Sequence, residues 1–382
     1  MGNRWVALAI VFVTRTSMGL QFQTVASVAP PMLGELQLSY AQLGTLIGIY
    51  MLPGAFFALP AGVIGQRFGE RRVVVAGLAL MVAGSVLTAV AGGFGAAATG
   101  RAVSGVGAVL MNILLARLIS SWFAGKELST AMAVMLASWP VGLGLATATL
   151  GAVAAGLGWR WAVGTTAIAA ALGLLLMLVY REAPRPADAA AEPARASMSG
   201  RDLRLSISAG FAWGCFNASL VTIIAFGPGL LIARGATLGD AGFVVSLALW
   251  LTMMSIPLGG LLSDRVGRPN LLIVAGSLVA AGLMLLIPVI TPPSLAFCLV
   301  GLAIGPPPGP LMSLLPRALA PERLTQGFGV FYTLFYVMMA LTQPAAGLVR
   351  DRAGDPAAPI VFAAAVMTAT VIGLAIFRRL ER

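Results

Sequence analysis

The sequence predicts an all-α membrane protein with twelve transmembrane helices arranged as two bundles of six. Of its 382 residues, 59% are hydrophobic and only 10% are charged. Apolar runs of about 20 residues recur along the whole chain, and a run of this length spans a bilayer as a helix. The chain also repeats itself at an offset of 198 residues, which accounts for two bundles.

Each predicted span is one of these apolar runs. They are too long for transmembrane strands and do not alternate, and open sheet edges cannot lie in lipid. Six runs precede a polar central segment and six follow it. In order along the chain, the predicted spans are 5–31, 42–64, 73–92, 95–119, 128–156, 161–180, 206–232, 240–262, 271–290, 295–316, 326–348 and 358–378.

The internal repeat predicts how the spans are grouped. Five residue pairs match at the same offset: Pro30 with Pro228, Gly44 with Gly242, Gly62 with Gly260, Arg67 with Arg265, and Gly69 with Gly267. The segment between the halves is rich in Ala, Pro, Arg and acidic residues, which is typical of a solvated linker. We therefore expect a bundle at 1–180, a cytoplasmic central loop at 181–206 and a bundle at 207–382. An even number of spans in each half makes the repeats parallel.

The net charge of +11 reflects topology rather than nucleic-acid binding. Of the 24 Lys and Arg residues, 18 fall on the side of the predicted termini and two lie inside spans. Because basic residues accumulate on the cytoplasmic side, both termini are expected in the cytoplasm. The four basic residues on the opposite side are Arg160, Arg234, Arg350 and Arg352.

Two arginines, Arg15 and Arg101, lie inside predicted spans, whereas all 13 Asp and Glu residues fall in loops or at span ends. A guanidinium in hydrocarbon needs a partner or a hydrated cavity. Since no carboxylate is available within the membrane, a small anionic substrate is the expected partner. Arg15 lies about ten residues into the first span, hence roughly 15 Å deep at 1.5 Å per residue. An arginine satisfied by backbone carbonyls or water is the alternative.

Several other classes of function lack the residues they need. The chain has no His, and its two cysteines, Cys215 and Cys298, lie inside predicted spans away from any carboxylate cluster. No metal site, cofactor or catalytic nucleophile–base pair is expected, so the protein is not predicted to be an enzyme. The first apolar run is too long for a signal-peptide core and should remain as a helix. A monomer in the lipid bilayer is expected.

Motifs in both halves resemble those of the major facilitator superfamily. Three segments show the resemblance: Gly62 to Arg72 after the second span, Gly260 to Arg268 after the eighth, and Arg101-Ala-Val-Ser-Gly105-Val-Gly107 in the fourth. The resemblance implies the two-bundle fold of secondary transporters. Within the superfamily, Arg15 upstream of Pro30-Pro31 and the segment Trp213–Ser219 are similar to the cyanate-porter-like anion carriers.

The resemblance also implies a gating role for the two loop motifs. In the family, such loops are thought to stabilise the outward-open state by bonding to a neighbouring helix end. The gating residues it implies here are Gly62, Arg67, Asp264, Arg265 and Arg268. Gln66 stands where the first motif usually has Asp, which predicts a weaker latch in the first half. A basic loop that only fixes topology is the alternative.

In this fold, helices 1, 4, 7 and 10 are implied to line the central cavity. The substrate-binding candidates are Arg15, Arg101, Asn112, Trp213 and Asn217, together with Tyr332 and Tyr336 in helix 11. Arg15 can grip a planar oxyanion through two parallel bonds. Arg101 shares a helical stripe with Asn112, but a role in helix packing is equally compatible. The two tyrosines are also compatible with packing, and Gly305–Pro310 cannot form a regular helix.

The predicted function is secondary transport of a small organic or pseudohalide-like anion across a bacterial inner membrane. Arg cannot release a proton, so coupling would come through a counter-transported anion, a proton carried by the substrate, or a carboxylate at a membrane edge. A drug or metabolite exporter is the alternative. Exporters of this superfamily usually carry a Gly-Pro motif in helix 5, and Ser138–Gly144 departs from it. A non-transporting receptor would need a long soluble segment, which the sequence lacks.

Overall fold

The computed structural model describes residues 3–58, 60–123, 127–183 and 198–382, except for the side chains of Ser129, Asp264 and Pro321. Within these ranges the chain is helical and contains no β-strand, which confirms the all-α class. Twelve helical stretches are long and apolar enough to cross a membrane, as the sequence predicted. The protein is therefore a multi-pass membrane protein.

In its described residues, the first bundle contains nine helices because proline and glycine interrupt two of its six spans. They are α1 (Arg4–Ser27), α2 (Ala29–Leu36), α3 (Tyr40–Gly48), α4 (Pro53–Phe57), α5 (Ala61–Phe68), α6 (Glu70–Ala89), α7 (Phe94–Trp122), α8 (Leu128–Leu157) and α9 (Trp159–Val179).

The second bundle, described from residue 198 onward, contains eight helices. They are α10 (Gly200–Ile232), α11 (Leu238–Val266), α12 (Pro269–Leu286), α13 (Pro293–Ala303), α14 (Pro308–Met312), α15 (Leu314–Ala318), α16 (Pro321–Ala353) and α17 (Ala358–Glu381). The expected irregularity at Gly305–Pro310 is present, because residues 304–307 separate α13 from α14.

Two spans differ from the sequence prediction at prolines. The first ends at Ser27 rather than at residue 31, since Pro30 and Pro31 lie in the first turn of the separate helix α2, which begins at Ala29. The second was expected as one helix over 42–64, but it is broken after Gly48 and again near residue 60. Proline lacks the N–H that continues a helix, and Pro53 therefore begins α4 as a new helix. The break leaves carbonyl groups at the end of α3 without intrahelical donors.

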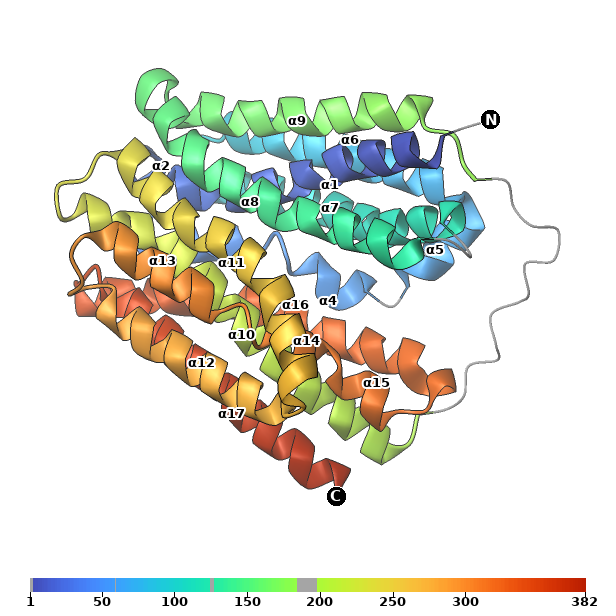
Figure 1. The fold of residues 1–382 in the computed structure, drawn as a ribbon. Helices are drawn as coiled ribbons and strands as arrows, with labels where there is room; N and C mark the ends of the chain where they lie inside the picture. The colour runs from blue at the N-terminus through green and yellow to red at the C-terminus, as the bar shows by residue number, and fades with distance from the viewer. Residues whose placement is uncertain (1–2, 59, 124–126, 184–197) are drawn as a thin grey trace.

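Figure 1 shows the two bundles converging at one end and diverging toward the end where α1 begins and α9 and α17 end. We call these the closed end and the terminal end. At the closed end α3 packs on α16, and the outer part of α8 packs on α11. Gly44 of α3 lies against Gln343 of α16, and Gly242 of α11 lies against Thr147 of α8, so two glycines paired by the sequence repeat make equivalent contacts between the bundles.

The contacts at the closed end are made largely by backbone. A Cβ at Gly48 would overlap Ala340, a Cβ at Gly347 would overlap Tyr40, and a Cβ at Gly151 would lie 2.8 Å from the carbonyl of Leu238. Small residues permit such close helix approach in membrane proteins. At the terminal end, no described atom of another segment lies within 4 Å of a Cβ built at Gly260.

Asp351 adds a polar link between the bundles at the closed end. Its carboxylate accepts hydrogen bonds from the backbone N–H groups of Tyr40 (2.9 Å) and Ala41 (2.8 Å), at the start of α3. An anion at a helix N-terminus satisfies free donors and interacts favourably with the helix dipole. The neighbouring Arg350 guanidinium lies 5.0 Å from the centre of the Tyr40 ring. This carboxylate therefore stabilises the closed arrangement of the two bundles.

Asp351→Asn is expected to shift the molecule toward arrangements in which the closed end has parted, by about threefold to tenfold. The amide keeps one acceptor oxygen but loses the charge. The measurement is the distance distribution between spin labels placed at the exposed positions Gly34 and Ala353. Asp355→Asn is the matched control, because Asp355 accepts its bond from Ala357 within the second bundle. Identical distributions in both variants would show that the Asp351 link is dispensable.

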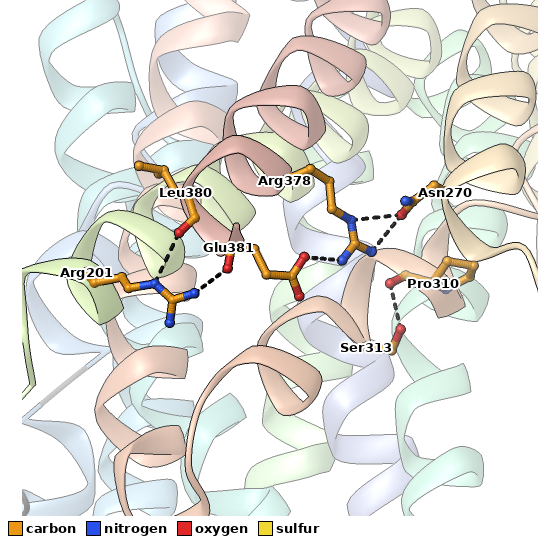
Figure 2. Close-up of polar contacts among 7 residues, drawn as sticks. All are labelled: Arg201, Asn270, Pro310, Ser313, Arg378, Leu380 and Glu381. Atoms are coloured by element: carbon orange, nitrogen blue, oxygen red, sulfur yellow. Dashed lines mark hydrogen bonds and ion pairs between the residues drawn. The ribbon is translucent and has the colours of Figure 1, made fainter.

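The terminal end of the second bundle is held together by arginines (Figure 2). Arg378 of α17 donates to Asn270 of α12 at 2.6 and 3.0 Å, and it also pairs with Glu381. Arg201 of α10 donates to the carbonyls of Leu380 and Glu381. These bonds join three helices of one bundle, which favours its movement as a unit.

Candidate functional site

Arg15 lies in α1 and is held by two other helices of the first bundle. Its Nε donates to Asn112 Oδ1 of α7 at 2.8 Å. Its Nη1 donates to the carbonyls of Met135 and Leu136, both at 3.0 Å, and to Ser138 Oγ at 3.1 Å, all in α8. The side chain is 7% exposed.

The acceptors on α8 are available because of Pro140. Proline at position i leaves the carbonyl of residue i−4 without its helical donor, and this carbonyl belongs to Leu136. Ser138 contributes a hydroxyl from the same turn. The Arg15 guanidinium thus replaces the missing donor inside α8 and holds α1, α7 and α8 at fixed distances.

The charge of Arg15 is solvated but not neutralised. All of its acceptors are neutral oxygens, and no carboxylate in the described part of the chain forms an ion pair with it. Its Nη2 makes no hydrogen bond to a described residue, and it is not among the buried polar atoms that lack a partner. Two N–H groups are therefore available to an incoming acceptor.

Two tyrosines of the second bundle lie opposite this guanidinium. The hydroxyls of Tyr332 and Tyr336, both in α16, lie within electrostatic reach of Arg15. Tyr336 is 5% exposed, approaches the side chain of Asn112, and packs its ring on Gly54 of the first bundle. Tyr332 is 37% exposed. The two bundles thus contribute a cation and two hydroxyl groups to one region.

Trp213 and Asn217 lie one turn apart on α10, and both are half-buried. The Trp213 ring stacks on Phe331 at 6.2 Å, and Phe331 contacts Tyr332 edge-on at 5.3 Å. Asn217 donates to the carbonyl of Trp213 within its own helix. Trp213 is therefore joined to the tyrosines through Phe331, whereas no described hydrogen bond connects Asn217 to the Arg15 region.

Arg101 occupies a different environment, deep within the first bundle. Its three nitrogens donate to the carbonyls of Leu46 (2.9 Å), Gln21 (2.6 Å) and Phe22 (3.1 Å), and its guanidinium lies 4.4 Å from the centre of the Tyr50 ring. Leu46 is in the last turn of α3, where the break before Pro53 leaves carbonyls without donors. These contacts support the helix-packing alternative for Arg101.

The residues expected to gate the molecule lie at the terminal end. The side chains of Arg67, Arg265 and Arg268 are exposed and make no hydrogen bond or ion pair to the rest of the described chain. The carbonyl of Gly62 accepts from Arg117 within the first bundle. The Asp264 side chain lies outside the described residues. Gly69 and Gly267, which the repeat pairs, both have positive φ, at 88° and 64°.

The sequence reasoning did not identify the α8 acceptors, Gly54 or Asp351. A signal for the first was present, because Pro140 inside an apolar span exposes the carbonyl of Leu136. The sequence does not show which helix supplies the donor, since Arg15 and Leu136 are 121 residues apart.

A family model described as Major Facilitator Superfamily matches residues 11–343. The chain belongs to this superfamily. It is therefore a transporter and not an enzyme, and the resemblance seen in the loop motifs is confirmed. The narrower similarity to cyanate-porter-like carriers stays a prediction.

Several curated members of the superfamily are similar in sequence. The inner membrane transport protein YajR of Escherichia coli is 36% identical over 95 residues, which cover 25% of this chain and 20% of that protein. The 3-(3-hydroxy-phenyl)propionate transporter of Escherichia coli is 26% identical over 72% of this chain and 69% of its own length. The quinolone resistance protein NorB of Staphylococcus aureus is 23% identical over 68% of this chain and half of its own length.

The superfamily fold is also found in solved structures. A bacterial homologue of the human lysosomal transporter Spinster, in an inward-facing and unoccupied conformation, aligns with a TM-score of 0.74. It is 18% identical, and the alignment covers all of this chain and 97% of that one. The nucleoside transporter NupG aligns over the whole of both chains with a TM-score of 0.77 and 13% identity.

Proposed function

We propose that this superfamily member is a secondary active transporter of a small organic anion in a bacterial inner membrane. The observation that carries the proposal is Arg15, whose charge has no carboxylate partner among the described residues and lies within electrostatic reach of two tyrosine hydroxyls of the second bundle. A buried charge without a counterion is unfavourable. A substrate anion offsets this cost when it binds, which makes anion binding favourable.

The proposed cycle is a rocking of residues 1–180 against 207–382. With both termini in the cytoplasm, the closed end faces the periplasm and the bundles diverge toward the cytoplasm. Backbone contacts at Gly44 and Gly242 support this movement, because they hold the bundles together with few directional side-chain bonds. The gating motifs at Arg67 and Arg265 are then parted, in agreement with a latch that engages only when the terminal end closes.

The similarity to a transporter named for 3-(3-hydroxy-phenyl)propionate supports an organic anion, since propionate is a carboxylate. A counter-transported anion or a proton is the proposed coupling partner, by symport or antiport. Because an arginine guanidinium does not release its proton in proteins, a transported proton would move on the substrate or on a carboxylate outside the site.

The test is counterflow in proteoliposomes loaded with one organic anion and challenged with labelled anions or cations. Exchange of monocarboxylates, with no exchange of a cationic quinolinium dye, is the expected result. Empty liposomes and liposomes with heat-unfolded protein are the controls. Exchange of the cation without exchange of any anion would exclude the proposal.

A drug or metabolite exporter is the second candidate, and the similarity to the quinolone resistance protein NorB favours it. Its difficulty is electrostatic. A cationic drug would approach Arg15 with no described carboxylate paired to it that could compensate the repulsion. The same counterflow measurement distinguishes the two candidates.

A further inference from the structure

Only one nitrogen of the Arg15 guanidinium is available to a ligand. Nε is bonded to Asn112, and Nη1 is shared among acceptors on α8. The two-nitrogen fork that arginine usually offers to a carboxylate is therefore occupied within the protein. A ligand can accept from the two N–H groups of Nη2 without breaking the bonds that hold α1 to α7 and α8.

A single free nitrogen favours a ligand with a single negative charge. The other buried arginine, Arg101, already donates to three carbonyls. A second negative charge on the ligand would find hydroxyl groups but no second cation. Because an unpaired charge is costly away from water, a dianion is disfavoured relative to a monoanion of similar size.

The surface that faces Arg15 is aromatic. Five of nine consecutive residues of α16 carry rings: Phe328, Phe331, Tyr332, Phe335 and Tyr336. Adjacent rings in this series contact each other with centroid distances between 5.1 and 6.2 Å, and Trp213 of α10 stacks on Phe331 at 6.2 Å. We call these six residues the aromatic cluster.

Part of the aromatic cluster remains uncovered by protein. Tyr332 is exposed, while Phe328, Phe335 and Trp213 are half-buried. Tyr332 is also close enough to Arg15 to interact with its charge. An apolar ring lying on this surface would therefore sit within reach of the charge at Arg15. A small inorganic or pseudohalide anion has no apolar part to cover the rings and would gain nothing from them.

We infer that the ligand is an aromatic monocarboxylate, with its carboxylate at Arg15 Nη2 and its ring against the aromatic cluster. Ring pairs in offset or edge-on geometry gain energy beyond the burial of area. Tyr332 supplies both a ring face and a hydroxyl donor to such a ligand. This inference rests on the proposed anion transport and narrows its substrate class from small organic anions in general to flat, singly charged carboxylates.

The test compares five matched ligands in binding and counterflow: phenylacetate, cyclohexylacetate, acetate, the dianion phenylmalonate and the neutral phenylacetamide. Phenylacetate should bind about tenfold or more tighter than acetate, and several-fold tighter than cyclohexylacetate. Phenylmalonate and phenylacetamide should bind at least about tenfold more weakly than phenylacetate.

Tyr332→Leu should lower the phenylacetate-to-acetate affinity ratio by about fivefold, because acetate loses only the hydroxyl whereas phenylacetate also loses the contact with the ring. The ratio separates a contact with the ligand ring from a general loss of structure, which would weaken both ligands to the same extent. Trp161→Leu is the matched control, because Trp161 is 65% exposed on α9, outside the aromatic cluster. It should leave the ratio unchanged.

The outcomes separate the two claims. If the wild-type protein binds and exchanges acetate or thiocyanate as strongly as phenylacetate, the aromatic inference is wrong and anion transport stands. An unchanged ratio in Tyr332→Leu would also overturn the inference. If the protein exchanges none of these anions, the proposed function itself fails.

Discussion

Arg15→Lys is expected to remove most anion transport while leaving the protein inserted and folded. Lysine has one nitrogen at the end of a flexible chain. It cannot donate to Asn112, to the α8 carbonyls and to a substrate at the same time, as the three nitrogens of Arg15 can. Each charge-assisted hydrogen bond contributes about 1.5–3 kcal/mol, so the loss of one bond to the substrate corresponds to roughly tenfold to a hundredfold lower exchange.

The measurement is counterflow of phenylacetate or another monocarboxylate, normalised to the amount of folded protein in the liposomes. Arg204→Lys is the matched control, since Arg204 is exposed and donates only to the carbonyl of Gly200 in its own helix. The control should exchange at the wild-type rate. Wild-type exchange by Arg15→Lys would remove Arg15 from the binding site.

Arg101→Met is expected to destabilise the protein rather than alter its selectivity. The substitution keeps an apolar chain but leaves the carbonyls of Leu46, Gln21 and Phe22 without the donors that Arg101 provides. The side chain is 4% exposed, so water cannot easily replace these donors. An unsatisfied buried acceptor costs about 1–3 kcal/mol. We therefore expect the free energy of unfolding to fall by about 3 kcal/mol or more, or the variant to fail to accumulate in the membrane.

The measurement is thermal unfolding in detergent, followed by the affinity of the folded fraction for the matched ligands. Arg101→Lys should unfold at an intermediate temperature, because lysine reaches fewer of the three carbonyls. Its folded fraction should keep the wild-type order of ligand affinities. A wild-type unfolding temperature combined with lost binding would instead place Arg101 in the substrate site.

The sequence predicted the membrane class and the number of spans because these depend on local composition. It also placed Arg15 and Asn112 on helices that proved to contact each other. It did not predict that α8 would solvate Arg15, or that Arg101 would satisfy the broken second span. Both features depend on how helices distant in sequence are rotated against one another, and a single sequence carries little information about such packing.

The two prolines in these spans also show that a single sequence reveals local effects but not the contacts between distant helices. Pro140 and Pro53 were visible in the sequence, and each removes a backbone N–H donor, the first inside the continuous helix α8 and the second after the break that follows α3. An arginine bonded to backbone carbonyls was one of the alternatives, but the sequence did not show which carbonyls each guanidinium would bind. Both buried arginines thus donate to backbone carbonyls of other helices, and of these two only Arg15 keeps N–H groups for another partner.

The hydrogen bonds between Asp351 and the start of α3 depend on a side chain in the second bundle but only on the backbone in the first. The donors at Tyr40 and Ala41 belong to the main chain, so they persist whatever side chains stand there, proline excepted. The acceptor depends on one codon. In a scan of all substitutions, most replacements of Asp351 should therefore reduce transport, whereas polar replacements of Tyr40 and Ala41 should be tolerated. Sequence changes at these two positions of the first bundle would then leave the hydrogen bonds intact.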